Sequence, residues 1–301
     1  MDRENKERPF CTGLGEILFD CLPGGERLGG APVNFAYSAK ALGLRAAAVS
    51  AVGRDERGDR ARRLLAEKGI AAHLAETDRE TGRVDVLLDT DGVPSYHFLP
   101  EPAYGSIPWT EALARLAEET DICCFGTLAQ WGEVSRRTVR RFLASMRPAA
   151  LRVFDVNLRG TFYTEEIIRG SLCCADAVKC SEEELERLAS AAGCGGAGPD
   201  DLAAFLRGMG ICKLIYTKGE KGSLVWWDGK RSELASPKTD VADTVGAGDA
   251  FTAALTAAMA CGWSLREAHR LAAETAAYVC SREGAMPEYP PRLAGRLGRA
   301  E

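Results

Sequence analysis

The sequence predicts an α/β fold of three layers, in which helices cover both faces of a mostly parallel central sheet. Short apolar runs alternate with amphipathic helical stretches along the 301 residues, which is the strand-helix order of parallel sheets. The length allows a large core, and α/β domains of this size often stay undivided. One stretch breaks the alternation and predicts a small additional sheet. We therefore expect a single domain over residues 1–301 with one appendage.

The N-terminal third predicts two strand-helix units. TGLGEILFD, residues 12–20, is apolar enough for a first strand, and residues 32–43 have the pattern of a helix. Residues 46–53 predict the next strand and residues 58–69 the next helix. Further strands are predicted, from their apolar residues, at 122–125, 151–156, 177–180, 214–217 and 223–227.

Residues 83–99 depart from this order. Polar and apolar side chains alternate over residues 83–89 and 94–99, on either side of the turn Thr90-Asp91-Gly92. This pattern predicts a β-hairpin. Because a hairpin is antiparallel, it cannot belong to the parallel sheet. Residues 193–199, GCGGAGP, predict a loop.

Composition and charge narrow the classes of partner and compartment. The net charge is −5, and basic residues cluster only on one helical face, at Arg136, Arg137, Arg140 and Arg141, which argues against nucleic acid. No stretch of eighteen apolar residues occurs and the first ten residues carry charges of both signs, so we expect neither secretion nor a membrane span. The eleven cysteines are odd in number and form no C-x-x-C, as in a cytoplasmic protein with reduced thiols.

The segment DTVGAGDAF, residues 243–251, is the most informative of the chain. The run AFTAALTAAMA that starts at Ala250 is free of helix breakers, so a helix is expected to begin at or just before Asp249. The first amides of a helix lack intrahelical partners and carry partial positive charge, and Gly246 and Gly248 leave room for a phosphate beside them. Asp249 in the same turn would take a proton from an attacking hydroxyl. The segment thus predicts a phosphoryl-transfer site.

Two other interpretations of this segment remain. An aspartate in the first turn of a helix often serves only as a cap for the amides. A dinucleotide-binding turn is the second interpretation, but GAGDAF lacks the third glycine of G-x-G-x-x-G and lies far from the N-terminus.

DTVGAGDAF resembles the C-terminal signature of the ribokinase-like (PfkB) carbohydrate kinases. A second set of motifs, about 200 residues earlier, resembles the N-terminal signature in its fructokinase-type form: GGAPVNFA at 29–36, ALG at 41–43 and AVGRDERGD at 51–59. The resemblance extends from about residue 11 to 290. It implies the ribokinase-like α/β/α fold with a β-sheet lid over the sugar, built here from segments of about 21–30 and 82–105. Lids of this family often pair into homodimers.

The resemblance implies an ATP-dependent sugar kinase, with a fructokinase acting on the 6-hydroxyl of fructose as the first choice. Asp249 would be the catalytic base, and the backbone of Gly246, Ala247 and Gly248 would hold the transferring phosphoryl group. A kinase of 2-keto-3-deoxygluconate, ribose or a nucleoside remains an alternative, as does a non-catalytic sensor of sugars or nucleotides on this fold.

The substrate residues implied by the resemblance lie at three places. Asp20, expected where the first strand ends, Gly30 and Asn34 would contact the sugar, since ligands bind at the carboxyl ends of strands in open sheets. The segment Asp155-Val156-Asn157-Leu158-Arg159 resembles the D-x-N-x-R of fructokinases, in which Asn157 and Arg159 would face the substrate and the phosphate. The structural alternatives are that Asp20 ends a strand, Asn34 caps a helix and Arg159 forms a surface ion pair.

The nucleotide site carries no P-loop or protein-kinase motif. Thr217, Gly219 and Gly222 match the family's T-x-G-x-x-G loop over ATP, although the glycines also fit a plain hairpin turn. Glu184 matches the acid of the family's N-x-x-E element, which acts on Mg²⁺ through water.

Two further features come from the same comparison with the family. Ser181 stands where the N-x-x-E element usually has asparagine, and with Glu184 it also fits a capping box. Asp243 and the carbonyl of Val245 would bind a monovalent cation, which makes K⁺ a candidate activator.

Overall fold

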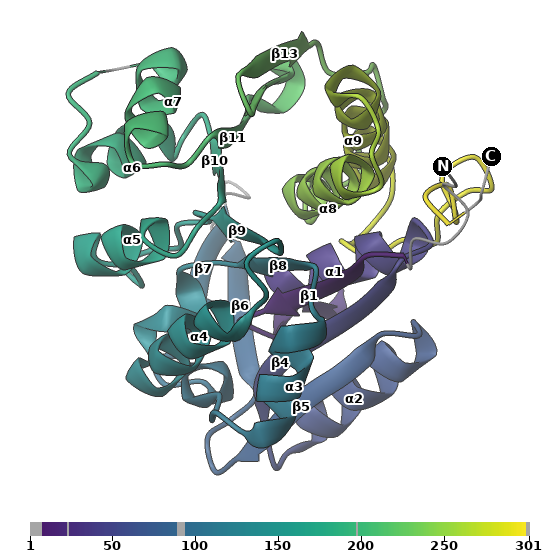
Figure 1. Cartoon of the computed structure of the whole chain (residues 1–301). Helices are drawn as coiled ribbons and strands as arrows, with labels where there is room; N and C mark the ends of the chain where they lie inside the picture. Colours follow the sequence, from purple (N-terminus) through teal and green to yellow (C-terminus); the bar gives the residue numbers. More distant parts are fainter. Residues whose placement is uncertain (1–7, 23, 89–93, 197, 299–301) are drawn as a thin grey trace.

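The computed structural model describes residues 8–22, 24–88, 94–196 and 198–298. A nine-stranded sheet in the order β13-β12-β11-β10-β9-β8-β1-β4-β5 forms its centre (Figure 1). Its strands are β1 Phe10–Leu14, β4 Arg45–Gly53, β5 Ala71–Thr77, β8 Ile122–Phe125, β9 Leu151–Asp155, β10 Ala177–Ser181, β11 Lys213–Thr217, β12 Ser223–Trp227 and β13 Lys230–Leu234. The seven strands from β11 to β5 are parallel, and β12 and β13 are antiparallel at one edge. The predicted mostly parallel sheet is confirmed.

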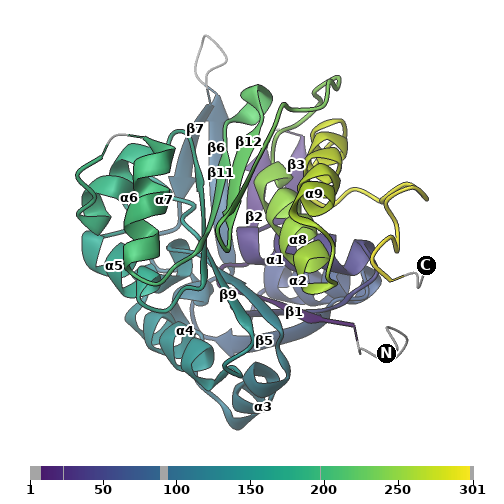
Figure 2. The same cartoon turned by 45° about the horizontal axis from the view of Figure 1, so that its top comes forward.

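Helices cover both faces of this sheet and bury two apolar cores. One core contains side chains of α1 Ala31–Ala41, α2 Glu56–Glu67, α8 Ala247–Ala260 and α9 Leu265–Cys280. The other contains side chains of α3 Glu111–Glu119, α4 Glu133–Ser145, α5 Glu165–Leu172, α6 Leu185–Ala192 and α7 Pro199–Gly208. On the first face, α8 packs against both α9 and α1 (Figure 2). The three-layer prediction is confirmed.

A second, four-stranded sheet has the order β3-β2-β6-β7. Its strands are β2 Leu18–Leu22, β3 Gly25–Gly29, β6 Gly82–Leu88 and β7 Pro94–Phe98. The strands β6 and β7 pair antiparallel, as the hairpin prediction required, although its turn falls in residues 89–93, outside the described residues. Residues 23 and 197, within the segments predicted as lid and loop, also lie outside them.

The predicted first strand, residues 12–20, is wrong, because it is two strands that belong to different sheets. β1 ends at Leu14 in the main sheet, and β2 begins at Leu18 in the small sheet. The chain turns away where Pro32 of α1 lies against it: a Cβ on Gly15 would come within 2.8 Å of the Pro32 ring, and Gly15 has a φ of +153°. Apolar side chains in both strands conceal this break in the sequence.

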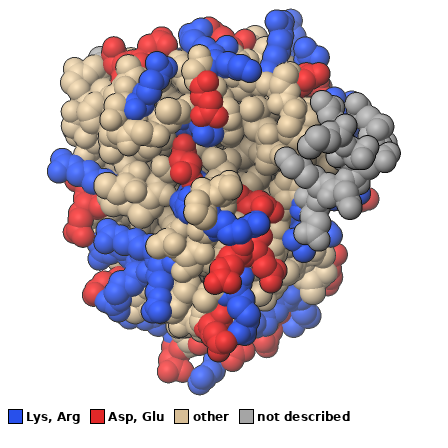
Figure 3. Space-filling model, in the orientation of Figure 1, with Lys and Arg blue, Asp and Glu red and all other residues tan. Residues whose placement is uncertain are grey.

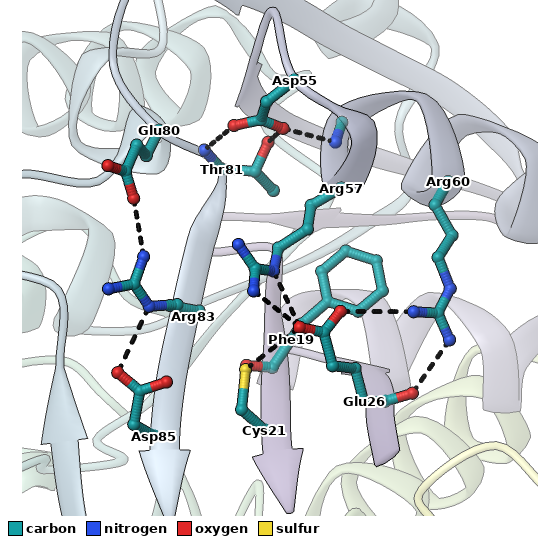
Figure 4. Close-up of polar contacts among 11 residues, drawn as sticks. Phe19, Cys21, Glu26, Asp55, Arg57, Arg60, Glu80, Thr81, Arg83 and Asp85 are labelled. Carbon is teal, nitrogen blue, oxygen red and sulfur yellow. Dashed lines mark hydrogen bonds and ion pairs between the residues drawn. The ribbon is translucent and has the colours of Figure 1, made fainter.

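Charged side chains fasten the small sheet to α2 (Figure 4). Glu26 of β3 accepts hydrogen bonds from Arg57 at 2.6 and 3.1 Å and from Arg60 at 3.3 Å, and Arg60 also donates to the Glu26 carbonyl at 3.0 Å. Asp55 caps α2 through the Gly58 amide and accepts from the Thr81 amide and hydroxyl. We call Glu26, Arg57 and Arg60 the sheet anchor.

Charged side chains of both signs lie on the surface. On the face shown in Figure 3, basic side chains lie among acidic ones. Across the described part of the chain, no helix has the length and apolar character that crossing a bilayer requires.

Candidate active site

The glycine-rich segment forms the start of α8, as predicted. Gly246 is the N-cap residue in a left-handed conformation, with φ of +78°, and a Cβ there would lie 2.5 Å from the Ala285 Cβ. Among the described residues, the amides of Gly248 and Asp249 have no hydrogen-bond acceptor. A helix N-terminus with free amides attracts anions. We call residues 246–249 the anion turn.

Asp249 does not cap this helix, because its carboxylate contacts a second helix. The Asn34 side-chain amide of α1 donates to Asp249 Oδ2 at 2.8 Å, which brings the two sequence signatures together across 215 residues. Asn34 is in the interior of α1, so the structural alternative that it caps a helix is wrong. Its Oδ1 is buried and has no partner among the described residues. A hydroxyl donor would satisfy that oxygen.

Gly30 allows α1 to begin close to the chain between the two sheets. It is the N-cap residue of α1 with φ of +114°, and a Cβ on it would lie 2.4 Å from the Glu16 carbonyl oxygen. Any side chain would push α1 away and move Asn34 from Asp249.

The environment of Asp249 shifts the pKa of its carboxyl group in both directions. Burial raises the pKa of Asp249 above its ordinary value, while the Asn34 hydrogen bond, Lys179 and Arg159 act to lower it. A raised pKa means that the carboxylate holds a proton more strongly than an exposed aspartate does.

Sequence reasoning missed the ion pair beside the anion turn. Lys179 Nζ of β10 lies 3.0 Å from Asp155 Oδ1 of β9, and the two residues are only 7% and 2% exposed. The available signal was the charged residues in two mainly apolar strands, Lys179 in AVKCS and both Arg152 and Asp155 in LRVFD. Charged residues are almost never fully buried unless they are paired.

Glu184 connects two loops at this edge of the sheet. Its Oε1 accepts from the Leu158 amide at 2.9 Å and its Oε2 from the Ser181 amide at 2.8 Å. Burial alone would raise the pKa of Glu184, but Lys179 and these amides hold it below the ordinary value. The bond to the Ser181 amide is the one that the alternative of a capping box required of Glu184. Ser181 itself does not cap α6, because the N-cap residue is Glu184.

Asp20 is not at the end of a main-sheet strand, which corrects the sequence-based placement. It lies within β2 of the small sheet, opposite Arg27 of β3. Burial raises the pKa of Asp20 to about 6, opposed by Arg159 and reinforced by Asp243. Although its strand was misassigned, Asp20 therefore lies within electrostatic range of Arg159.

The loop after β9 presents Asn157 and Arg159. Asn157 is buried with φ of +39°, a conformation that is costly for a residue other than glycine. Thr127 fixes this turn by donating to the carbonyls of Val156 and Asn157, at 3.1 and 3.3 Å. Arg159 is exposed, and no carboxylate in the described chain lies within 4 Å of it. The surface ion pair considered for Arg159 is absent there.

Glu16 is a second buried acid that sequence reasoning missed. It connects β1 to β2, is 2% exposed, and its Oε2 has no partner among the described residues. Burial raises its pKa to about 7, with Asp249 adding to the shift and Arg159 opposing it.

Comparison with known proteins identifies the family. The family model described as "pfkB family carbohydrate kinase" matches residues 23–292. The chain belongs to this family. It is 31% identical to a fructokinase of Escherichia coli, over 93% of this chain and 95% of that protein.

Two solved structures give the same result for the fold of this carbohydrate kinase. The sugar kinase PH1459 of Pyrococcus horikoshii, in complex with ATP, is 27% identical with a TM-score of 0.75, covering 92% of this chain and 94% of that one. A fructokinase of Xylella fastidiosa with bound ATP has a TM-score of 0.82 at 23% identity, covering 95% and 96%. The chain thus has the ribokinase-like fold and is a sugar phosphotransferase.

In this kinase, Thr217 ends β11, and Gly219 and Gly222 lie in the turn between β11 and β12. The Lys218 amide donates to the Gly222 carbonyl at 2.8 Å, and a Cβ on Gly222 would lie 2.1 Å from the Leu234 carbonyl oxygen. The plain hairpin turn is therefore present. A role for this turn in nucleotide binding stays a prediction.

Asp243 fixes the loop in front of the anion turn. Its Oδ1 accepts from the Val245 amide at 3.0 Å, and its Oδ2 accepts from the Gly284 amide at 3.0 Å and lies 3.5 Å from Arg27 Nη1. Within the described residues, no three acidic, cysteine or histidine side chains are arranged to hold a metal ion.

Proposed function

We propose that this protein transfers the γ-phosphoryl group of ATP to the 6-hydroxyl of fructose. The observation that carries the proposal is the contact between Asn34 and Asp249, 2.8 Å long, beside the free amides of α8. This contact brings a side-chain amide, a buried carboxylate and backbone amides without acceptors into one small region, which supports a site for a sugar hydroxyl and a phosphate. The fructokinase relative supports fructose as the acceptor.

In the proposed reaction, Asp249 takes the proton of the hydroxyl as its oxygen attacks the γ-phosphorus. The amides of Gly246, Ala247, Gly248 and Asp249 offset the charge on the transferring group. A single donor of this kind typically raises kcat by a factor of about 10²–10³. The sugar would be bound by Asp20, Gly30, Asn34, Asn157 and Arg159.

The nucleotide and ions are part of the same proposal. ATP would lie over the β11–β12 turn at Thr217, Gly219 and Gly222, with Ser181 near its phosphates. Glu184 is ionised and suits a water ligand of Mg²⁺, which when bound supplies further charge neutralisation. The Val245 carbonyl and Asp243 would bind K⁺, although both Asp243 oxygens already accept backbone hydrogen bonds.

The proposal also covers the location of the enzyme in the cell and its oligomeric state. We expect the enzyme to work in the cytoplasm and to form homodimers through the small sheet, where Tyr96 is 61% exposed and Leu22 36%. Light scattering would measure the mass in solution, and a monomeric mass would refute the dimer.

The decisive experiment is an ATP-turnover assay over a panel of sugars. Fructose should be the preferred acceptor, with fructose 6-phosphate as the product. Phosphorylation of 2-keto-3-deoxygluconate, ribose or a nucleoside in its place would refute fructose as the acceptor. The protein would still be an ATP-dependent kinase. Binding of a sugar without ATP turnover would support the non-catalytic sensor instead.

A further inference from the structure

Lys179 has an unusual position for a structural lysine. Alternation along β10 puts Lys179 and Ser181 on the same face of the strand, and Lys179 is paired in register with Asp155 of β9. The ammonium has three N–H donors. In the described chain, Asp155 is its one hydrogen-bond acceptor, at 3.0 Å.

The end of this side chain lies against the anion turn. A Cβ built on Gly248 would be 3.3 Å from Lys179 Nζ and 3.6 Å from its Cε. The glycine therefore leaves space for the lysine as well as for a phosphate. The ammonium is next to the backbone whose amides have no acceptor.

The charges near Lys179 are the carboxylates of Asp155, Glu184 and Asp249, and the free amides at the start of α8 lie beside them. Burial would lower the pKa of Lys179, but Asp155, Glu184 and Asp249 raise it above the ordinary value, so the side chain stays protonated. A cation beside a helix N-terminus meets the positive end of the helix dipole, which is unfavourable. An anion between the ammonium and the free amides would turn this repulsion into attraction on both sides.

A buried ion pair is also weak evidence for stability, because desolvation of the two charges offsets their attraction. Stabilisation of the fold therefore does not explain why Lys179 and Asp155 are buried as an ion pair.

We propose that Lys179 donates a hydrogen bond to the γ-phosphoryl group and stays with it during transfer, with Asp155 as its positioning partner. This inference rests on the proposed function. In that reaction the sugar oxygen forms a bond to the γ-phosphorus and the bond to the β,γ-bridging oxygen breaks. The hydroxyl proton goes to Asp249 and ADP leaves with the electron pair, while Lys179 neither gains nor loses a proton.

The test removes the pair as a unit. Lys179→Met alone would leave Asp155 charged and buried, and this variant could fail to fold for that reason. Replacement of a buried pair by apolar residues of similar volume is often tolerated, so the main variant is Lys179→Met with Asp155→Leu. The matched control is Lys213→Met in the neighbouring strand β11. It breaks the 2.8 Å pair with Asp228, which follows β12, outside the anion turn. Thermal unfolding establishes that each variant is folded.

Two measurements follow on the folded variants: kcat, and the dissociation constants of ATP and ADP by calorimetry. The double variant should lose about 10²–10³ in kcat and bind ATP about tenfold more weakly, as expected for one charge-assisted hydrogen bond. Its affinity for ADP, which has no γ-phosphate, should stay unchanged, and Lys213→Met should match the wild type in all respects.

A folded double variant with a kcat within about threefold of the wild type would overturn the proposal, since loss of a transition-state contact lowers kcat. An equal loss of affinity for ATP and for ADP would also overturn the proposal, because the lysine would then contact a part of the nucleotide other than the γ-phosphate. If the wild type phosphorylates no sugar, the proposed function fails, while the difference between ATP and ADP affinity still reports on Lys179.

Discussion

The sheet anchor and the anion turn use charged residues in opposite ways. In the anchor, both carboxylate oxygens of Glu26 accept from arginines, at 2.6 to 3.3 Å. At the anion turn, two amides, one ammonium and the Asn34 oxygen have unused hydrogen-bonding capacity within the described residues. Paired groups hold elements together, whereas groups left unpaired in a folded protein are available to a ligand.

The pKa shifts follow the same division. Hydrogen bonds from Arg57 lower the pKa of Glu26 against the effect of partial burial. Burial raises the pKa of Asp249, and that of Glu16 to about 7. For a carboxyl group, a lowered pKa means that the charge stabilises the fold, while a raised pKa marks a charge that the fold carries at a cost. Glu184 is the exception beside the anion turn, because Lys179 and two backbone amides lower its pKa.

The largest expected effect is on Asp249. Asp249→Asn should lower kcat by at least about 10², because a positioned base typically contributes 10²–10⁴ in rate. Its unfolding temperature should stay near that of the wild type, since the asparagine can still accept from Asn34. Steady-state kinetics and thermal denaturation check both expectations. Turnover above about a tenth of the wild type would rule out Asp249 as the base.

Gly248→Val tests the free space in the anion turn. The new Cβ would lie 3.3 Å from Lys179 Nζ and block the approach of a phosphate, so kcat should fall by about 10²–10³. Gly208→Val at the end of α7 is the control, because nothing lies within 4 Å of a Cβ there. Normal turnover by a folded Gly248→Val variant would show that the phosphoryl group is not transferred at the anion turn.

Asp20→Ala tests whether a residue of the small sheet contacts the sugar. The KM for fructose should rise by about tenfold or more, from one or two charge-assisted hydrogen bonds of about 1.5–3 kcal/mol each. The KM for ATP should change little. Asp85→Ala, in β6 of the same sheet, removes a surface pair with Arg83 and serves as the control. Equal effects of the two substitutions on the KM for fructose would contradict a contact at Asp20.

Arg159→Ala distinguishes two roles for the exposed guanidinium. If Arg159 meets the transferring phosphate, kcat should fall while the KM for fructose stays unchanged. With 2-keto-3-deoxygluconate as the substrate, a role in binding its carboxylate would instead appear as a higher KM. Kinetics with both acceptors distinguish contact with the phosphate from contact with the carboxylate. An unchanged kcat and KM for both acceptors would show that Arg159 takes no part in the site.

The smallest effect is expected in the sheet anchor. Glu26→Gln should lower the free energy of unfolding by about 1 kcal/mol, the upper range for partly exposed ion pairs, and leave kcat unchanged. Because the pKa of Glu26 is lowered in the folded state, its contribution is present above the unfolded pKa of about 4.3 and is lost as the pH falls below it. Urea unfolding of both proteins at neutral and acidic pH measures this difference. A constant difference across that pH range would contradict an ionic origin.

The sequence by itself determined the features that depend on neighbouring residues. Apolar runs located β8 and β12 with their bounds, because both strands are buried along their whole length and therefore carry apolar side chains on both faces. Glycines and an alanine-rich run located the start of α8, since helix ends obey local backbone rules. Strands β3, β5 and β13 were missed because they lie at sheet edges, where exposed polar side chains remove the apolar pattern.

Only the tertiary structure decided which distant groups meet. The packing of Pro32 against Gly15 splits one apparent strand between two sheets and moves Asp20 into the smaller one. The contact of Asn34 with Asp249, the pairing of Lys179 with Asp155 and the burial of Glu16 join segments from separate parts of the chain. A sequence records which side chains are available, but burial and the distance between charges are set by how the layers pack, and these two quantities determine the pKa and the chemistry of each group.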